Sequence, residues 1–168
     1  MKELQLHYIG IDAIPAALEK ARQYRSLLEP EQAESICLEI LEVQPDNHEA
    51  RILLILVLTD QFSLSGKPLN VKGVMERIEE LPDAYERLYY KGLVSERRAR
   101  ALLHESMSRS FTYGYFREAM HWYEQAEKIR PAHNDDAILR WNACVRTLRR
   151  ERLQPRPDRD EVHQDMES

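Results

Sequence analysis

The sequence predicts an all-α protein of about seven helices, arranged as three helix pairs and a C-terminal capping helix. Apolar residues recur every three or four positions over most of the chain, which is the spacing of amphipathic helices. Only five of the 168 residues are glycine, and long stretches lack the alternation that marks strands. The length suggests one domain with a sizeable core. We therefore predict one helical domain over residues 1–153, followed by an acidic, disordered tail at 154–168.

The composition favours a soluble, cytoplasmic protein. Charged residues make up 32% of the chain and hydrophobic ones 43%, which are ordinary values for a globular protein. Cys37 and Cys144 lie inside helical patterns rather than in a CxxC motif, which favours a reducing compartment. The longest apolar run, residues 52–58, is far shorter than the roughly 20 residues that span a bilayer. No secretory signal is recognisable at the start, so we expect no membrane role.

The first helix pair is bounded by prolines. Asp12 is the predicted N-cap of a helix that reaches residue 28, with Pro15 in its first turn. Pro30 opens the second helix and Pro45 ends it. Before this pair lies a short irregular lead-in, which we expect to be packed down by its apolar residues Leu4, Leu6, Tyr8 and Ile9.

The middle pair begins with a helix over residues 47–61, capped by Asp46 and Asn47. This helix is apolar on nearly every side, which indicates an interior position between other helices. A loop rich in Ser, Gly and Pro follows at 62–69. A further amphipathic helix starts near Val71 and ends at Pro82.

The third pair is predicted to start with one long helix, Asp83–Phe111, whose only internal breaker is Gly92. Gly114 then marks the expected turn into the closing helix, which Pro131 ends. A capping helix follows at 134–152, with Asn134 as its N-cap. Asp135 and Asp136 lie where negative charge suits the helix dipole.

Two of the closing helices repeat one pattern. Ala33, Cys37, Ile40 and Pro45 correspond to Ala119, Tyr123, Ala126 and Pro131, and each residue lies 86 positions from its counterpart. This pattern of small, bulky, small or apolar residues and proline resembles that of the tetratricopeptide repeat, a motif of about 34 residues. The resemblance covers roughly residues 13–150 and points to the small bacterial type of such proteins. The corresponding repeats are 14–47, 48–82 and 83–131.

The resemblance implies a right-handed superhelix of helix pairs that binds other proteins and needs no cofactor. Its concave groove would be lined by the helices at 13–28, 47–61 and 83–111. The lysine and asparagine clamp of some chaperone-binding members has no counterpart here. The implied function is a protein–protein interaction scaffold or adaptor, with a specialised secretion or assembly chaperone as the alternative.

Glu96 interrupts an apolar helix face, on which Gly92 and Ala99 also lie. A carboxylate in such a place is costly unless it is paired. One interpretation is an internal salt-bridge network between Glu96 and neighbouring arginines, Arg140 among them. A second is a basic patch of Arg97, Arg98 and Arg100 that grips an acidic peptide, with Arg51 as a further contact. The third is an idle, solvated face.

No convincing catalytic or metal-binding set is present in the sequence. The six histidines are scattered, without a ligand pair at helical spacing. Ser65-Gly66-Lys67 lacks the earlier glycine of a phosphate-binding loop, and neither cysteine has a redox signature. We therefore predict a protein that is not an enzyme and holds no metal or cofactor. Exposed aromatics at Tyr90, Tyr113 and Trp122 are a further candidate for partner contact.

Charge is distributed unevenly along the chain. Residues 1–50 carry a formal charge of −6, whereas residues 84–153 carry +5. Opposite ends of this kind could attract one another in neighbouring molecules, so self-association is possible. The basic residues could also touch phosphates, but nine acidic residues are interleaved with them and no nucleic-acid motif is present. A nucleic-acid partner is therefore not expected.

Overall fold

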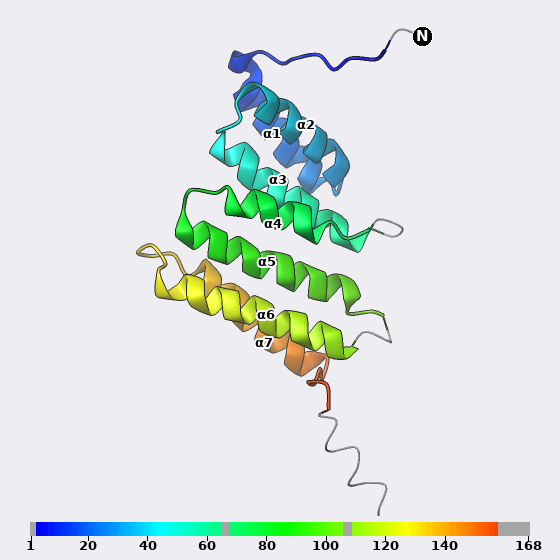
Figure 1. Cartoon of the computed structure of the whole chain (residues 1–168), viewed down its shortest axis with the longest axis vertical. Coiled ribbons are helices and arrows are strands. Elements are labelled where there is room, and N and C mark those ends of the chain that lie inside the picture. Colours follow the sequence, from blue (N-terminus) through cyan, green and yellow to red (C-terminus); the bar gives the residue numbers. More distant parts are fainter. Residues whose placement is uncertain (1–2, 65–67, 106–108, 158–168) are drawn as a thin grey trace, which may run out of the picture. The chain divides into compact units, whose positions relative to one another are not determined.

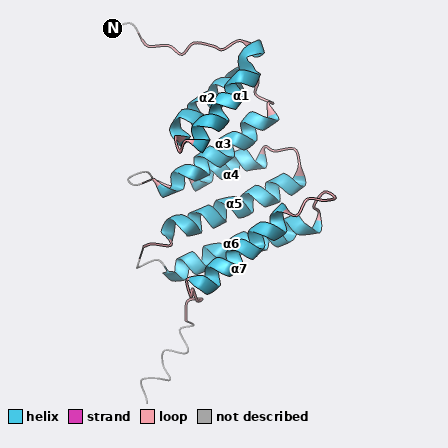
Figure 2. Ribbon diagram, turned by 180° about the vertical axis from the view of Figure 1, so that it is seen from behind, coloured by secondary structure: helices cyan, strands magenta, loops and turns pink. Residues whose placement is uncertain are grey.

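The computed structural model describes residues 3–64, 68–105 and 109–157, and within them every regular element is a helix (Figures 1 and 2). This confirms the predicted all-α class. The chain divides into two compact units, unit 1 (Met1–Leu81) and unit 2 (Pro82–Ser168), which we describe separately. Unit 1 contains the single-turn 3₁₀ helices η1 (Ile11–Ala13) and η2 (Gln61–Ser63) and the α-helices α1 (Ile14–Ser26), α2 (Pro30–Val43), α3 (His48–Asp60) and α4 (Val71–Glu79). Unit 2 contains α5 (Ala84–Leu102), α6 (Arg109–Lys128) and α7 (Asp136–Arg150).

In unit 1 each helix packs mainly on the one before it. α1 and α2 form a hairpin, α3 covers α2 and also touches α1, and α4 packs on α3 (Figure 1). The predicted interior character of α3 is confirmed, because buried residues lie all around it. They are Ala50, Leu53, Leu54, Ile55, Val57 and Thr59.

Most of the predicted helix starts in unit 1 are confirmed. Pro15 and Pro30 lie in the first turns of α1 and α2, where a missing N–H costs nothing. Asn47 caps α3, since its Oδ1 accepts a hydrogen bond from the Ala50 amide at 2.9 Å. The prediction for Asp12 is wrong: it lies within η1, and α1 begins after it without a side-chain cap.

The predicted packing of the lead-in is also wrong. Residues 3–10 are extended and leave the helices, so Leu4, Leu6 and Tyr8 are 99%, 86% and 77% exposed. Only Ile9, close to η1, packs against the core that Ile14 and Leu18 share with α2 and α3. Apolar character identified these residues as candidates for packing, but the direction in which the chain leaves η1 takes them away from the core.

Unit 2 is a hairpin of α5 and α6, with α7 packed on α6. Its core contains Tyr85 and Ala99 from α5, Phe116 and Tyr123 from α6, and Cys144 from α7. The positions that repeat at a spacing of 86 residues are equally buried in the two units. None of the six has any exposed surface: Ala33, Cys37 and Ile40 in α2, and Ala119, Tyr123 and Ala126 in α6.

The predicted long helix at 83–111 is wrong. α5 ends at Leu102, and α6 already begins at Arg109, so Gly114 lies inside α6 rather than at a turn. No glycine or proline stands at the observed break, and the continuing periodicity therefore concealed it. Residues 106–108, which the expected helix included, lie outside the described residues.

A C-terminal helix follows α6, as the sequence predicts. α7 corresponds to the expected capping helix at 134–152, and Leu153 after it is buried in the unit 2 core. The expected disordered tail starts at residue 154, and residues 158–168 lie outside the described part of the chain.

Gly92 allows the closest approach of α5 to α6. A Cβ atom there would lie 2.5 Å from the Tyr123 ring, whereas one at Gly114 would meet nothing within 4 Å.

We predict that Gly92→Ala lowers the free energy of unfolding by about 1–3 kcal/mol, because the buried ring has to move. Gly114→Ala in the same hairpin should raise it by about 0.5–1 kcal/mol through helix propensity. Urea denaturation of both variants tests this, and a stabilised Gly92→Ala would contradict the packing.

Candidate functional site

Glu96 is the buried centre of a polar network in unit 2. Its side chain has no exposed surface, accepts hydrogen bonds from its own helix and from α6, and forms an ion pair with a residue of α7. Arg100 donates from Nε to Oε1 at 2.9 Å and its Nη2 lies 2.8 Å from the same oxygen in an ion pair, while the Tyr123 hydroxyl donates to Oε2 at 2.6 Å. The Arg140 guanidinium lies 3.6 Å from Oε1. One carboxylate therefore connects α5, α6 and α7.

Both arginines of this network extend from Glu96 toward solvent. About a third of each side chain, Arg100 and Arg140, is exposed, so only the carboxylate is fully removed from water. Arg100 also donates to the Thr147 hydroxyl at 3.3 Å, and Thr147 in turn donates to the Ala143 carbonyl of α7. Two cations around one anion leave a net positive charge at the edge of the network.

Two other ionisable groups near Glu96 are held in their protonated forms. Burial and the adjacent carboxylate raise the pKa of Tyr123 well above its usual value, so its hydroxyl remains a donor to Glu96. Burial, reinforced by Glu96, raises the pKa of Cys144 to about 12. A thiol of that pKa is a poor nucleophile at neutral pH.

The three arginines of the predicted basic patch do not converge. Arg98 and Arg100 lie about 160° apart around α5, given 3.6 residues per turn. Arg100 points to Glu96, whereas the Arg98 guanidinium stacks on the Tyr115 ring at 4.0 Å from its centroid. Arg97 is half-buried and has interactions of its own. Arg100 thus belongs to the Glu96 network, whereas Arg98 belongs to a cation–π contact on another side of α5.

The start of α7 is held by Asn134, but not as the N-cap that the sequence predicts. The N-cap position belongs to Asp135, because α7 begins at Asp136. From one residue earlier, Asn134 Oδ1 accepts hydrogen bonds from the Asp136 amide at 3.0 Å and from the Tyr85 hydroxyl at 3.1 Å. Asp135 pairs with Arg130 at 3.3 Å. These contacts join the first turns of α5 and α7.

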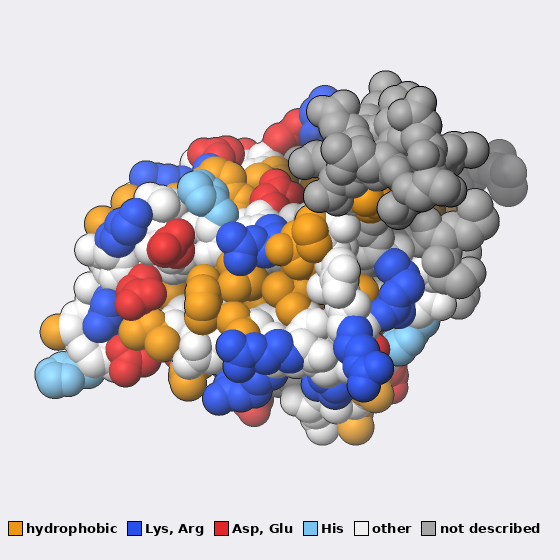
Figure 3. All heavy atoms as spheres, turned by 90° about the horizontal axis from the view of Figure 1, so that it is seen from below, with side chains coloured by type: hydrophobic (Ala, Val, Ile, Leu, Met, Phe, Trp, Pro, Cys, Tyr) orange, Lys and Arg blue, Asp and Glu red, His pale blue; other side chains and the backbone are white. Residues whose placement is uncertain are grey.

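The exposed side of α7 is basic. Arg146, Arg149 and Arg150 of α7 are exposed, and Figure 3 shows lysine and arginine side chains around an apolar area on the face seen from below. Of the predicted exposed aromatics, Tyr113 packs against the core and Trp122 lies beneath Lys91, whose Nζ is 5.1 Å from the ring centroid. Tyr90 contacts Tyr89 edge-on.

Arg51 borders a small hollow of about 240 Å³ in unit 1. Its Nε donates to the Pro45 carbonyl at 2.8 Å, which holds the side chain across the start of α3. Arg77 and Glu80 line the other side of this hollow. Arg51, the predicted contact residue, therefore shares this hollow with a second arginine, Arg77, and with the acidic residue Glu80.

A larger hollow, which we call the α1–α3 hollow, has a volume of about 470 Å³. Such a volume lies within the range of ligand-binding pockets in proteins. One wall is apolar and comes from η1 and α1: Ile11, Ile14, Pro15 and Leu18. The other is polar and comes from α1, the end of α2 and the start of α3: Arg22, Gln44, Asn47 and Glu49. Its two walls thus differ in chemistry.

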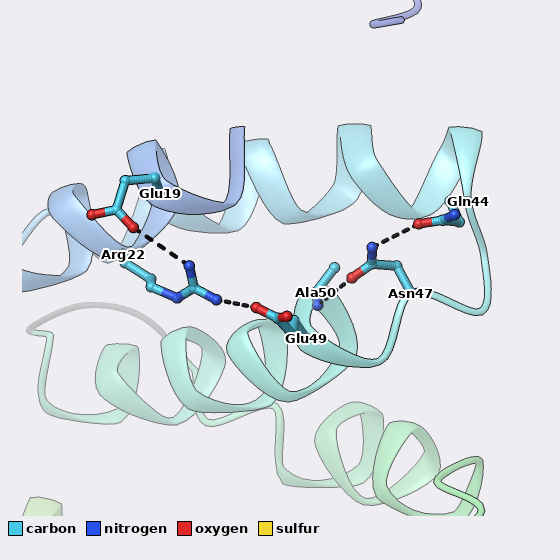
Figure 4. Close-up of polar contacts among 6 residues, drawn as sticks. All are labelled: Glu19, Arg22, Gln44, Asn47, Glu49 and Ala50. Carbon is cyan, nitrogen blue, oxygen red and sulfur yellow. Dashed lines mark hydrogen bonds and ion pairs between the residues drawn. The ribbon is translucent and has the colours of Figure 1, made fainter. Parts of the chain in front are cut away.

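The polar wall is organised by side-chain contacts, as Figure 4 shows. Arg22 lies between two carboxylates, with Nη2 against Glu49 and Nη1 3.5 Å from Glu19. Asn47 donates from Nδ2 to Gln44 Oε1 at 2.7 Å while it caps α3. About half of the Arg22 side chain is exposed, so the ion pair with Glu49 faces solvent.

The sequence did not indicate this hollow. Arg22 and Glu49 are 27 residues apart, and neither residue type nor spacing relates them. Asn47 was recognised only as a helix cap. The structure brings Arg22 and Glu49 together because α1 contacts α3.

The described residues show no group of three or more His, Cys, Asp or Glu side chains arranged to hold a metal ion. In the same part of the chain, no helix has the length and hydropathy needed to cross a bilayer.

We predict that Glu96→Ala lowers the free energy of unfolding by about 3 kcal/mol, because it leaves two arginines and a buried hydroxyl without their acceptor. Glu96→Gln keeps the shape and should fall between the wild type and the alanine variant. The control is Glu127→Ala, whose carboxylate is 3.9 Å from Arg130 at the surface and should contribute less than about 0.5 kcal/mol. Equal denaturation midpoints for Glu96→Ala and Glu127→Ala would contradict a central role for Glu96.

Comparisons of the chain with protein-family models, with curated proteins and with solved structures find no match. What the protein does is therefore inferred from the geometry of its own surfaces.

Proposed function

We propose that this chain is a non-enzymatic scaffold or adaptor that binds an extended segment of another protein in the α1–α3 hollow. The observation that carries the proposal is the division of this hollow into an apolar and a polar wall. An extended peptide directs successive side chains to opposite sides. Its apolar side chains would contact Ile11 and Pro15, which are exposed, and its polar groups would face Gln44 and Asn47.

The solvent-facing ion pair supports this use of the hollow. Arg22 and Glu49 lie at its rim, and an exposed pair of this kind contributes little to stability. A partner can therefore exchange its own charges or main-chain groups for this contact at small cost. The Arg51 hollow, with Arg77 beside it, would accept an acidic group of the same partner.

A fold of tetratricopeptide-type helix pairs is part of the same proposal. We infer tetratricopeptide-type helix pairs from the shared burial of the repeated positions in α2 and α6. Small side chains at Ala33 and Ala119 let a neighbouring helix approach closely in each unit. Tetratricopeptide repeat proteins bind partners through the surfaces of such helix pairs. The inferred fold therefore agrees with a binding role and does not call for a catalytic one.

A cytoplasmic location is part of the proposal and is supported by the two thiols. Cys37 and Cys144 are both buried and free. Burial raises the pKa of each to about 12, with a smaller contribution from Glu34 at Cys37. Neither is suited to nucleophilic chemistry at neutral pH.

The proposal predicts that reversing the ion pair of the hollow abolishes partner capture without unfolding the chain. The double variant Arg22→Glu/Glu49→Arg restores an opposite pair but exchanges the charges that a partner meets. In affinity purification from the native host, we expect it to lose at least about tenfold of any protein that the wild type enriches. Its denaturation midpoint should remain close to that of the wild type.

A matched control makes the same exchange on α4, where Lys72 and Glu76 form an exposed pair at 3.8 Å. Lys72→Glu/Glu76→Lys should capture the same proteins as the wild type. Unchanged capture by the Arg22/Glu49 variant would contradict the proposed site. If removal of the protein leaves a captured partner insoluble or degraded, the role is that of a chaperone; if the partner only fails to be recruited, it is that of an adaptor.

A further inference from the structure

The extended segment before η1 is an arm, residues 3–10, with an unusual surface. Its apolar residues Leu4, Leu6 and Tyr8 alternate with the polar residues Glu3, Gln5 and His7. The three apolar side chains are 99%, 86% and 77% exposed. One side of the arm is therefore an apolar stripe in water, and contiguous exposed apolar surface usually marks a contact with another molecule.

The arm has the properties that the α1–α3 hollow would bind. Alternation along an extended chain would direct Leu4, Leu6 and Tyr8 to the apolar wall while Glu3, Gln5 and His7 face the polar wall. Arg22 already pairs with Glu19 and Glu49, so Glu3 would have to replace the Glu49 carboxylate beside it. The apolar side of the arm thus suits the apolar wall of the hollow, and its polar side suits the polar wall.

The root of the arm lies at the rim of the same hollow. Ile11, the first residue after the arm, itself lines the hollow. The arm then runs away from α1, as Figure 1 shows, and eight extended residues reach at most about 26 Å. Because the arm root and the binding hollow are adjacent, one two-fold axis beside them would bring each arm to the hollow of the other copy.

We propose that two copies of this chain exchange their arms, and that each arm occupies the α1–α3 hollow of its partner. The contact is the same in both directions, so the assembly closes as a two-fold dimer, the commonest form of homo-oligomer. The inference rests on the proposed function in that it uses the same hollow, and it identifies the occupant as a second copy. A foreign segment would then have to displace the arm.

The test measures the mass of the full chain in solution. Sedimentation equilibrium of the wild type at micromolar concentration should give twice the 19.8 kDa mass of one chain. The arm variant Leu4→Ser/Leu6→Ser/Tyr8→Ser should weaken the dimer by at least about a hundredfold, because it removes three apolar side chains from the contact. Ile129→Ser/Leu139→Ser, the control, removes two exposed apolar side chains of unit 2 that lie outside both the arm and the hollow, and should remain a dimer.

A second variant tests the hollow independently. Pro15 is exposed on the apolar wall and lies in the first turn of α1, where a glutamate suits the helix dipole. Pro15→Glu should therefore fold but be monomeric. A mixture of the arm variant with Pro15→Glu should recover association, because one intact arm then meets one intact hollow. No other arrangement of these two surfaces predicts recovery on mixing.

A monomeric wild type at all concentrations would overturn the inference, and so would a mixture of the two variants that stays monomeric. These outcomes are separable from failure of the proposed function. Loss of foreign partners in the Arg22/Glu49 exchange, together with a monomeric wild type, rejects only arm exchange. A dimer that depends on both arm and hollow, without any captured partner, rejects only the binding of foreign proteins.

Discussion

Unit 2 depends on one buried charge. Glu96 lies where an apolar side chain would be expected, and its carboxylate connects α5 to α6 through Tyr123 and to α7 through Arg140. Moving a carboxylate out of water is costly, so the arrangement is stable only because hydrogen bonds replace hydration at both oxygens. Gly92 contributes to this geometry, since the absence of a side chain lets the Tyr123 ring approach α5.

Unit 1 is held together differently. Its interior is apolar, and α3 is surrounded by buried aliphatic residues, while ion pairs such as Arg25–Asp60 lie at its partly exposed edge. The Arg22–Glu49 ion pair of the α1–α3 hollow is exposed as well, so it contributes little to stability. The exposed polar contacts of the hollow thus lie in unit 1 and the buried polar network lies in unit 2. The arm at residues 3–10 adds a second accessible surface to the same end of unit 1.

Prediction from the sequence was most accurate where the signal was local. Prolines and Asn47 located the starts of α2 and α3, and periodicity located their buried faces. The break between α5 and α6 escaped because residues 103–108 contain no glycine or proline, whereas Gly114 suggested a turn that does not exist. For Glu96, its place on an apolar face indicated a need for partners, but the sequence left several arginines as candidates. The arm was misjudged because apolar character alone does not determine whether a segment meets a core.

The sequence by itself determined the helical class, most helix boundaries and the repeated buried positions of α2 and α6. These follow from periodicity and backbone preference, which act over a few neighbouring residues. Only the tertiary structure decided that Arg100 faces Glu96 while Arg98 stacks on Tyr115, that Arg22 meets Glu49, and that Leu4, Leu6 and Tyr8 face solvent. Those outcomes depend on the rotation of each helix against its neighbours and on the direction in which the chain leaves η1. Both are set by packing between residues far apart in the sequence, which no local pattern encodes.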